Sequence, residues 1–503
     1  MSAANRSAPS ARALAVIETG AAVTPASSHP GSAFGTRWER VVPQFFAHQA
    51  AGTDGTLAAT PRFHREPGAS VTEQQSNARF ALAVLFGINL MNFFDRQIAG
   101  ALGEPIRVEF GLNDTQLGLV ATVFTLVYAA VGVPLGRLTD NWLRTRLIAI
   151  GVTFWSVLTA ASGLAWNYTS FLLTRIGVGI GEASCAPAGQ SLIGDLYPPE
   201  RRARAMAIFM LGLPFGLFAA YMLSGYIGQK WGWRTAFFVA CLPGLILAVL
   251  ALFIKEPPRG GVEQRTSLAL PGSPFRSVMR IKTLWWIVLS GLLYNFNAYA
   301  VNVFQTPFLQ RFHELGLRDA NMISAFSLGL TGAIGLLLGG WLGDRLRTKR
   351  ANGRVLIAAF ALLFAAPCVF MALQQPKGGV VVFTILMGAS SALSFAYYST
   401  VYSAIQDVVA PNLRGTAVSL YFFAMYVLGA SFGSTVMGAL SDYFAHQAMV
   451  NAGATAMEDT FRASGLHSAM YVIPLLMLLC AGSLFGAART VGADMRAMVT
   501  QTR

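Results

Sequence analysis

The 503-residue chain has few charges, cysteines and histidines. Only 12% of its residues are charged, about half the fraction of a soluble globular protein, whereas 54% are hydrophobic. The four cysteines lie inside apolar runs without metal or disulfide spacing, and the six histidines are scattered, so we expect no metal, no cofactor and no catalytic site. A Gly-x-x-x-x-Gly-Lys-Ser/Thr phosphate-binding loop is also absent, which argues against an ATP-driven process.

The sequence is instead rich in long apolar runs. Twelve of them approach the ~20 residues that a helix needs to cross a bilayer. We therefore predict an all-α polytopic membrane protein with twelve transmembrane helices arranged as two pseudo-symmetric six-helix bundles. The predicted spans are residues 79–101, 115–137, 147–166, 170–196, 203–227, 233–254, 284–309, 320–343, 355–373, 380–408, 413–438 and 466–488.

The longest polar stretch between these runs divides them six and six. The predicted division is a disordered cytoplasmic N-terminal tail (1–78), a first bundle (79–254), a cytoplasmic linker (255–283), a second bundle (284–489) and a cytoplasmic C-terminal tail (490–503). The last outer loop, residues 439–465, is the longest on its side.

Lys and Arg gather in alternate loops, so the positive-inside rule places both termini in the cytoplasm, across the inner (plasma) membrane if the source is bacterial. The net charge of +14 comes largely from such loops, and we expect no nucleic-acid partner. The expected surroundings are a lipid bilayer, and the expected state is a monomer.

Two short loop motifs occur once in each half of the chain. Gly136 stands four residues before Asp140, as Gly340 stands before Asp344, and basic residues follow both. A second pair of motifs begins at Asp195 and Asp407. Matching loops in two six-helix halves indicate a pseudo-two-fold axis along the membrane normal.

These motifs predict a cytoplasmic gate. Asp140 and Asp344 are expected to accept hydrogen bonds from a helix N-terminus, where the dipole favours a negative group. Neighbouring basic residues are expected to pair with Asp195 and Asp407 when the cytoplasmic side is shut and to separate when it opens. The predicted gate residues are Gly136, Asp140, Arg144, Arg146, Asp195, Arg202, Asp344, Arg345, Arg347, Asp407 and Arg414.

Four charged residues fall well inside predicted spans of the first half, away from the first and last two residues of each span. Arg175 and Glu182 lie seven positions apart, about two helical turns, and so share one face. A charge in hydrocarbon costs at least ~2.5–3.5 kcal/mol, so such residues usually face a partner or a wet cavity. Helix rise places Asp95, Arg96 and Arg175 at a similar height, with Glu182 about 10 Å deeper.

We predict that Asp95 pairs with Arg175, and that Glu182 takes a proton or a substrate cation. Burial raises the pKa of a carboxyl and a neighbouring Arg lowers it, so alternating access to water would change the protonation state. That scheme gives proton coupling without enzyme chemistry. The alternative is a static ion pair that holds the bundle together.

The second half offers tyrosines and amides instead of buried charges. Together with residues of the first half they predict a central cavity with one charged wall and one aromatic, polar wall. Such a cavity suits either an amphiphile with a charged head and an apolar tail or a small organic anion, although some of these residues could serve packing or face lipid. The predicted cavity residues are Asn92, Tyr128, Tyr294, Asn295, Asn297, Tyr299, Tyr398 and Tyr402.

The loop signature at 132–146, repeated at 339–350, resembles that of the major facilitator superfamily. Within it the chain is most similar to the spinster-like transporters over about residues 80–488. The matching segments are Asn92-Phe-Phe-Asp95-Arg96-Gln97, Arg175-x-x-x-Gly179-x-Gly181-Glu182-Ala-Ser184, Asp195-Leu-Tyr-Pro, Gly232-Trp-Arg234 and Lys255-Glu-Pro-Pro-Arg259-Gly260. The chain departs from the family at Phe94, where Tyr is frequent, and at Asn141, where a basic residue is common.

The resemblance implies a secondary transporter that works by alternating access and is coupled to protons. It implies that the charged residues at 95, 96, 175 and 182 serve coupling and substrate binding, and it favours a lysolipid-type solute. Two alternatives stay open: a proton symporter of a small organic anion such as a sugar acid, and a sensor that no longer transports.

Overall fold

The computed structural model describes residues 71–259, 274–410 and 413–502, and within them the chain is almost entirely helical and contains no strand. The predicted all-α fold is therefore confirmed. The first half contains α1 (Val71–Ala101), α2 (Gly103–Phe110), α3 (Asp114–Asn141), α4 (Arg144–Gly163), α5 (Tyr168–Glu182), α6 (Cys185–Leu196), α7 (Pro199–Met210), α8 (Gly212–Trp231) and α9 (Trp233–Leu252).

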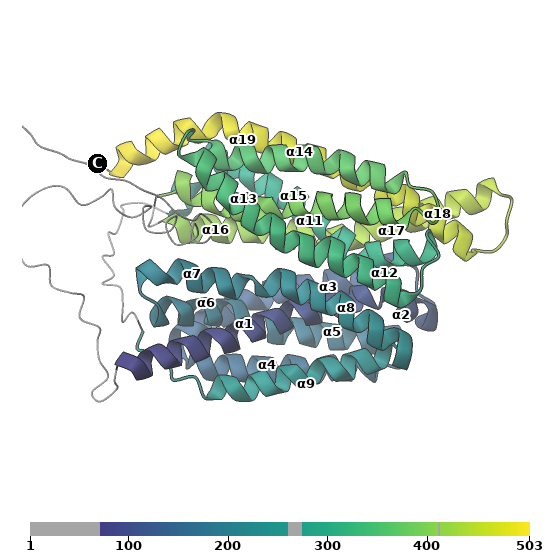
Figure 1. The fold of residues 1–503 in the computed structure, drawn as a ribbon, viewed down its shortest axis with the longest axis horizontal. Helices are drawn as coiled ribbons and strands as arrows, with labels where there is room; N and C mark the ends of the chain where they lie inside the picture. Colours follow the sequence, from purple (N-terminus) through teal and green to yellow (C-terminus); the bar gives the residue numbers. More distant parts are fainter. Residues whose placement is uncertain (1–70, 260–273, 411–412, 503) are drawn as a thin grey trace, which may run out of the picture. The chain divides into compact units, whose positions relative to one another are not determined.

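The second half begins with the short helix α10 (Pro274–Met279). It continues with α11 (Lys282–Arg311), α12 (Leu317–Ser324), η2 (Ala325–Leu330), α13 (Thr331–Arg347), α14 (Gly353–Leu373), α15 (Val380–Val408), α16 (Arg414–Phe423), η4 (Ala424–Ala430), α17 (Ser431–Asn451), α18 (Asp459–Met470) and α19 (Val472–Thr502). Figure 1 shows α1–α9, in purple to teal, grouped apart from α11–α19, in green to yellow.

Eleven helices of the described ranges are long and apolar enough to cross a membrane, against the twelve predicted spans. The difference lies at 170–196, where the chain forms two helices that meet after Glu182. Pro187, in the first turn of α6, has no N–H to donate to the preceding turn and so weakens the helix at this point. The Ser184 hydroxyl, which donates to the Gly181 carbonyl at 2.8 Å, supports the break.

Three predicted boundaries differ from the structure. α1 begins at Val71, inside the predicted tail 1–78, whose residues 1–70 lie outside the described ranges. α17 continues to Asn451 and α18 begins at Asp459, so most of the predicted outer loop 439–465 is helical. Beyond Ala488, α19 continues to Thr502, because residues 489–502 contain no proline and their only glycine is tolerated.

Small residues bring the two bundles into close contact. On α3, Gly118 lies so near the backbone of Ser434 on α17 that a Cβ atom there would clash. On the other side of the interface, Gly225 of α8 lies against Asn321 of α12, and Gly329 of η2 lies against the backbone of Phe218. These approaches seal one end of the interface between the bundles, as small residues do in packed membrane helices.

Candidate functional site: a cavity between the bundles

A cavity of about 1050 Å³ lies between the two bundles. It extends from Arg96 and Asn302 to the end of the bundles at Gly136 and Gln406, which we term the inner end in keeping with the predicted orientation. The structure places every predicted cavity residue on its wall: Asn92, Tyr128, Tyr294, Asn295, Asn297, Tyr299, Tyr398 and Tyr402.

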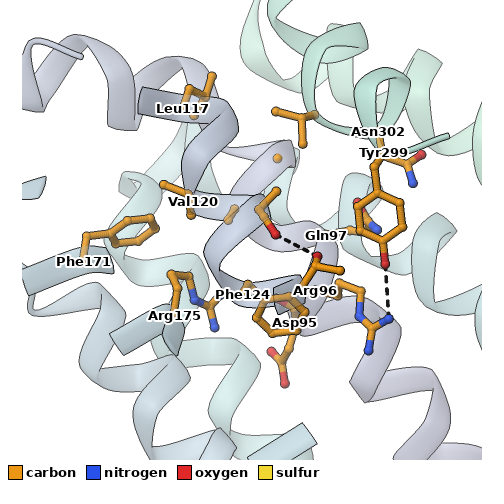
Figure 2. Close-up of a pocket in the computed structure, with 15 residues that line it drawn as sticks. Asp95, Arg96, Gln97, Leu117, Val120, Phe124, Phe171, Arg175, Tyr299 and Asn302 are labelled. Carbon is orange, nitrogen blue, oxygen red and sulfur yellow. Dashed lines mark hydrogen bonds between the residues drawn. The ribbon is translucent and has the colours of Figure 1, made fainter. Parts of the chain in front are cut away.

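Arg96 on α1 joins the charged wall to the opposite bundle. Its guanidinium lies 3.3 Å from the Glu182 carboxylate, and both side chains are almost fully buried. It also donates to the hydroxyl of Tyr299 on α11 at 3.4 Å, the bond drawn in Figure 2. The guanidinium carbon of Arg96 lies 4.4 Å from the centroid of the Tyr128 ring, a distance suited to a cation–π contact.

The Glu182 carboxylate is only partly satisfied. Its Oε2 accepts hydrogen bonds from Arg96 and, at 3.1 Å, from the Asn92 amide. Its Oε1 is buried without a hydrogen-bond partner among the described residues. A buried ionised carboxylate with an empty acceptor is costly, so the site favours binding a proton or a donor group there.

Asp95 and Arg175 are close together but do not form the predicted side-chain pair. Arg175 instead donates to the backbone carbonyl of Asp95 at 3.3 Å. The Asp95 carboxylate is turned toward α4, where its Oδ2 accepts from the Trp155 indole at 3.1 Å. Sequence reasoning missed Trp155, because an aromatic residue in an apolar span usually serves only packing.

Tyrosines of the second bundle form the opposite wall. Tyr294 and Tyr397 stack with ring centroids 4.1 Å apart, and Tyr421 donates to the hydroxyl of Tyr397 at 3.1 Å. Tyr398 reaches Asn295 at 3.4 Å and stacks on Tyr402. This buried network gives the wall a fixed aromatic surface whose hydroxyls bond to groups of the same bundle.

The predicted gate pair at Asp195 is present, with additional partners. Arg144 lies 2.5 Å from Asp195 and 2.7 Å from Glu256. Glu256 also accepts from the backbone N–H of Thr145 at 3.0 Å and so caps the start of α4. Burial alone would raise the pKa of Glu256, but the hydrogen bonds from Arg144 and Thr145 hold it below its usual value.

The corresponding pairs of the second half involve a residue that the sequence did not single out. Arg354, at the start of α14, lies 2.6 Å from Asp344 and 2.8 Å from Asp407, and Arg347 lies 3.2 Å from Asp407. Asp344 therefore accepts from the side chain of Arg354, where a helix N-terminus was predicted. These pairs are intact although the cavity extends to this end.

The other predicted gate residues have separate surroundings. Gly136 lines the cavity, and Arg146 is exposed. Arg202 donates to the Tyr197 carbonyl, and Arg414 donates to the Gln406 carbonyl. Arg345 lies over the ring of Trp341. The side chain of Asp140 is outside the described part of the chain, so its predicted bond stays a prediction.

The opposite end of the interface, which we term the outer end, is closed by ion pairs between the bundles. Arg311 on α11 lies 2.8 Å from Asp114 on α3 and 2.7 Å from Glu104 on α2. Asp442 on α17 accepts from the backbone N–H groups of Asp114 and Thr115 at 3.0 and 2.8 Å. Sequence reasoning missed this outer latch (Glu104, Asp114, Arg311 and Asp442), because charges at helix ends are common and their partners are distant in sequence.

Comparisons with known proteins agree with this architecture. The sequence profile of the Major Facilitator Superfamily matches residues 85–434. A protein described as an MFS-type efflux pump from Mycolicibacterium smegmatis is 29% identical over 81% of this chain and 90% of its own length. Protein spinster homolog 1 from Homo sapiens is 31% identical over 72% of each chain.

A solved structure resembles the chain along most of its length. It is a bacterial homologue of the human lysosomal transporter Spinster, in an inward-facing and unoccupied conformation. Its TM-score is 0.75 at 28% identity, and the match covers 85% of this chain and 99% of that one.

Proposed function

Since the chain belongs to the Major Facilitator Superfamily and to its spinster-like members, which are transporters and not enzymes, we propose that it is a proton-coupled secondary transporter that works by alternating access. The proposed solute is amphipathic and lipid-like or anionic, of the lysolipid type. Its partners are protons, that solute and the surrounding bilayer. The proposed orientation has both termini in the cytoplasm of a cell whose inner membrane holds the protein as a monomer.

The observation that carries the proposal is the buried ion pair between Arg96, which lines the large cavity between the bundles, and Glu182, which lies against Arg96 and is fully buried. Ionisable groups at membrane depth usually mark substrate or proton pathways. Arg96 offers an anionic head group a charged partner, and Glu182 offers a proton site next to it. An anion that binds Arg96 would weaken the ion pair between Arg96 and Glu182. Anion binding at Arg96 would thereby be linked to proton uptake at Glu182.

The size and lining of the cavity support a long solute. At about 1050 Å³ it exceeds the roughly 300–1000 Å³ of ordinary ligand pockets. Apolar side chains, including Leu213, Leu217, Leu336, Phe422 and Val427, line it beyond the charged wall. An acyl chain can contact these side chains while its head group stays at Arg96.

The outer latch and the inner end of the cavity support the proposal, because together they fit one state of an alternating cycle. The bundles meet at the outer end through Arg311 and Asp114, whereas the cavity extends to Gly136 and Gln406 at the inner end. Opening the outer end would require separating these ion pairs while the inner ends come together. Rocking of two bundles around a central site is the general mode for such repeats.

The test is uptake by proteoliposomes under an imposed pH gradient, with radiolabelled lysolipids compared with hexonates. Accumulation of lysolipids that collapses with a protonophore is the expected result. Accumulation of hexonates alone would favour the alternative, a proton symporter of a small organic anion. Ligand binding without gradient-driven flux of either class would favour a sensor.

A further inference from the structure

A second, much smaller cavity of about 30 Å³ lies behind the charged wall, and Figure 2 shows its lining. A water molecule needs at least ~10–15 Å³ of such space, so the chamber has room for about two. Asp95 and Arg175 line this chamber but not the large cavity. Arg96, Gln97, Tyr299 and Asn302 line both, and they form the partition between them.

Two residues that line the chamber, Asp95 and Arg175, carry side-chain atoms that the protein leaves unsatisfied. The Oδ1 of Asp95 and both Nε and Nη2 of Arg175 are buried without a hydrogen-bond partner among the described residues. Buried polar atoms in proteins are nearly always hydrogen-bonded to protein or to water. The size of the chamber and these atoms together suit a small cluster of water at Asp95.

The partition is made by residues of opposite bundles. Arg96 belongs to α1, whereas Tyr299 and Asn302 belong to α11. The hydroxyl of Tyr299 accepts from Arg96 at 3.4 Å. Close to this bond, Gly100 of α1 lies near the carbonyl of Asn302, where an added Cβ would be 3.0 Å from the oxygen. The partition therefore exists only while α1 and α11 are in contact.

We infer that Tyr299 is a positioning residue, which holds Arg96 across the opening between the large cavity and a water chamber at Asp95. Water from the large cavity then reaches Asp95 when the Arg96–Tyr299 bond breaks. This inference rests on the proposed function, since it gives Asp95 a controlled route to bulk water within a proton-coupled cycle. Among the described residues, the charged or titratable groups around Asp95 are Arg96 on its own helix, Arg175 and Glu182 on α5, and Cys241 on α9, and the neutral Trp155 of α4 donates a hydrogen bond to it.

The test measures access to the chamber without any substrate. The four native cysteines are replaced, and one cysteine is introduced by Thr125→Cys in the chamber or by Ser399→Cys in the large cavity. Labelling by methyl methanethiosulfonate is followed by mass spectrometry. Should Thr125→Cys fail to fold, Ala121→Cys reports on the same chamber.

With Tyr299 present, the chamber cysteine should react at least about tenfold more slowly than the cavity cysteine. Tyr299→Phe should speed the chamber reaction about tenfold, the equivalent of one hydrogen bond to a charged group, and leave the cavity reaction unchanged. Tyr471→Phe, which removes a hydroxyl bonded to Gln374 within the second bundle and lining neither cavity, is the matched control and should change neither rate.

Equal labelling of the two sites with Tyr299 present would overturn the inference, and so would a chamber rate that Tyr299→Phe does not change. The assay needs no transport. If uptake fails while labelling follows the expectation, the proposed function is refuted and the partition stands. If uptake succeeds while labelling does not follow it, this inference alone is refuted.

Discussion

At the scale of single residues, Arg96 connects most of the site. It contacts Glu182 and Asn92 in its own bundle, Tyr299 in the other, and the rings around it. A guanidinium cannot be deprotonated in a protein, so its charge is constant while its partners change. Glu182, Tyr299 and any incoming anion all bind the same guanidinium. A change in the interaction of Arg96 with one of them therefore alters its interactions with the others.

Glu256 offers a residue-scale prediction on stability. The native pKa of Glu256 lies below the ordinary value of about 4.3. The carboxylate therefore contributes fully to the free energy of unfolding above that pH, and this contribution is lost as the pH falls through the native pKa. Glu256→Gln should lower the melting temperature in detergent by a few degrees at neutral pH and flatten its decline toward pH 4. Intrinsic tryptophan fluorescence on heating measures both effects.

The control for this variant is Glu314→Gln. Hydrogen bonding to Lys377 also lowers the pKa of Glu314, but both side chains of that pair are largely exposed, at 70% and 63%. Exposed pairs contribute little to stability, so this control should leave the melting curve nearly unchanged. Identical pH profiles for wild type and Glu256→Gln would contradict the role given to the Glu256 cap.

At the scale of elements, the outer latch joins α2, α3, α11 and α17. Arg311 is 3% exposed and Asp114 is 1% exposed, so removing one partner leaves a buried charge, which costs about 3–5 kcal/mol. Arg311→Met should therefore shift the population toward an outward-open state by two or more orders of magnitude. Spin labels at Val108 on α2 and Asn451 on α17 should then show a longer distance population by double electron–electron resonance.

Lys377→Met is the matched variant, because it removes an outer-end charge whose pair lies within the second bundle. It should leave the distance distribution of the two labels as in the wild type. A distribution unchanged by Arg311→Met would show that the latch does not hold the outer end closed.

The sequence predicted most helices because apolar length and hydropathy are local properties. The span 380–408 matches α15 at both ends, and most others agree within a few residues. It failed at 170–196, where the effect of Pro187 on hydrogen bonding outweighs the continuous apolar run. It also missed Arg354, because its pairing with Asp407 joins helices 53 positions apart in sequence.

At the scale of the whole molecule, the cavity residues were predictable and their pairings were not. Polar residues in an apolar span can be recognised from the sequence alone. The eight cavity residues predicted in this way all line one cavity. Partner choice depends on how the helices rotate against one another. That rotation turns Asp95 toward Trp155 and brings Arg96 to Glu182, a pairing that the sequence did not predict.

The two ends of the molecule also differ in what holds them. Charges between the bundles close the outer end, at Arg311 and Asp114, whereas the inner pairs at Arg144 and Arg354 lie within a single bundle each. Pairs inside a bundle can persist while the bundles rock, which explains why they are intact beside an open cavity. We therefore propose a structural role for these pairs within each half, and their breaking on opening stays a prediction.

The most direct measurement compares Glu182→Gln with the wild type in proteoliposomes, for the solute identified by the uptake assay. The variant keeps the shape of the side chain and removes its titration. It should lose pH-driven accumulation down to the level of empty liposomes, yet still exchange internal for external labelled solute. Accumulation that still follows the pH gradient in Glu182→Gln would contradict the proposal that this carboxyl carries the proton.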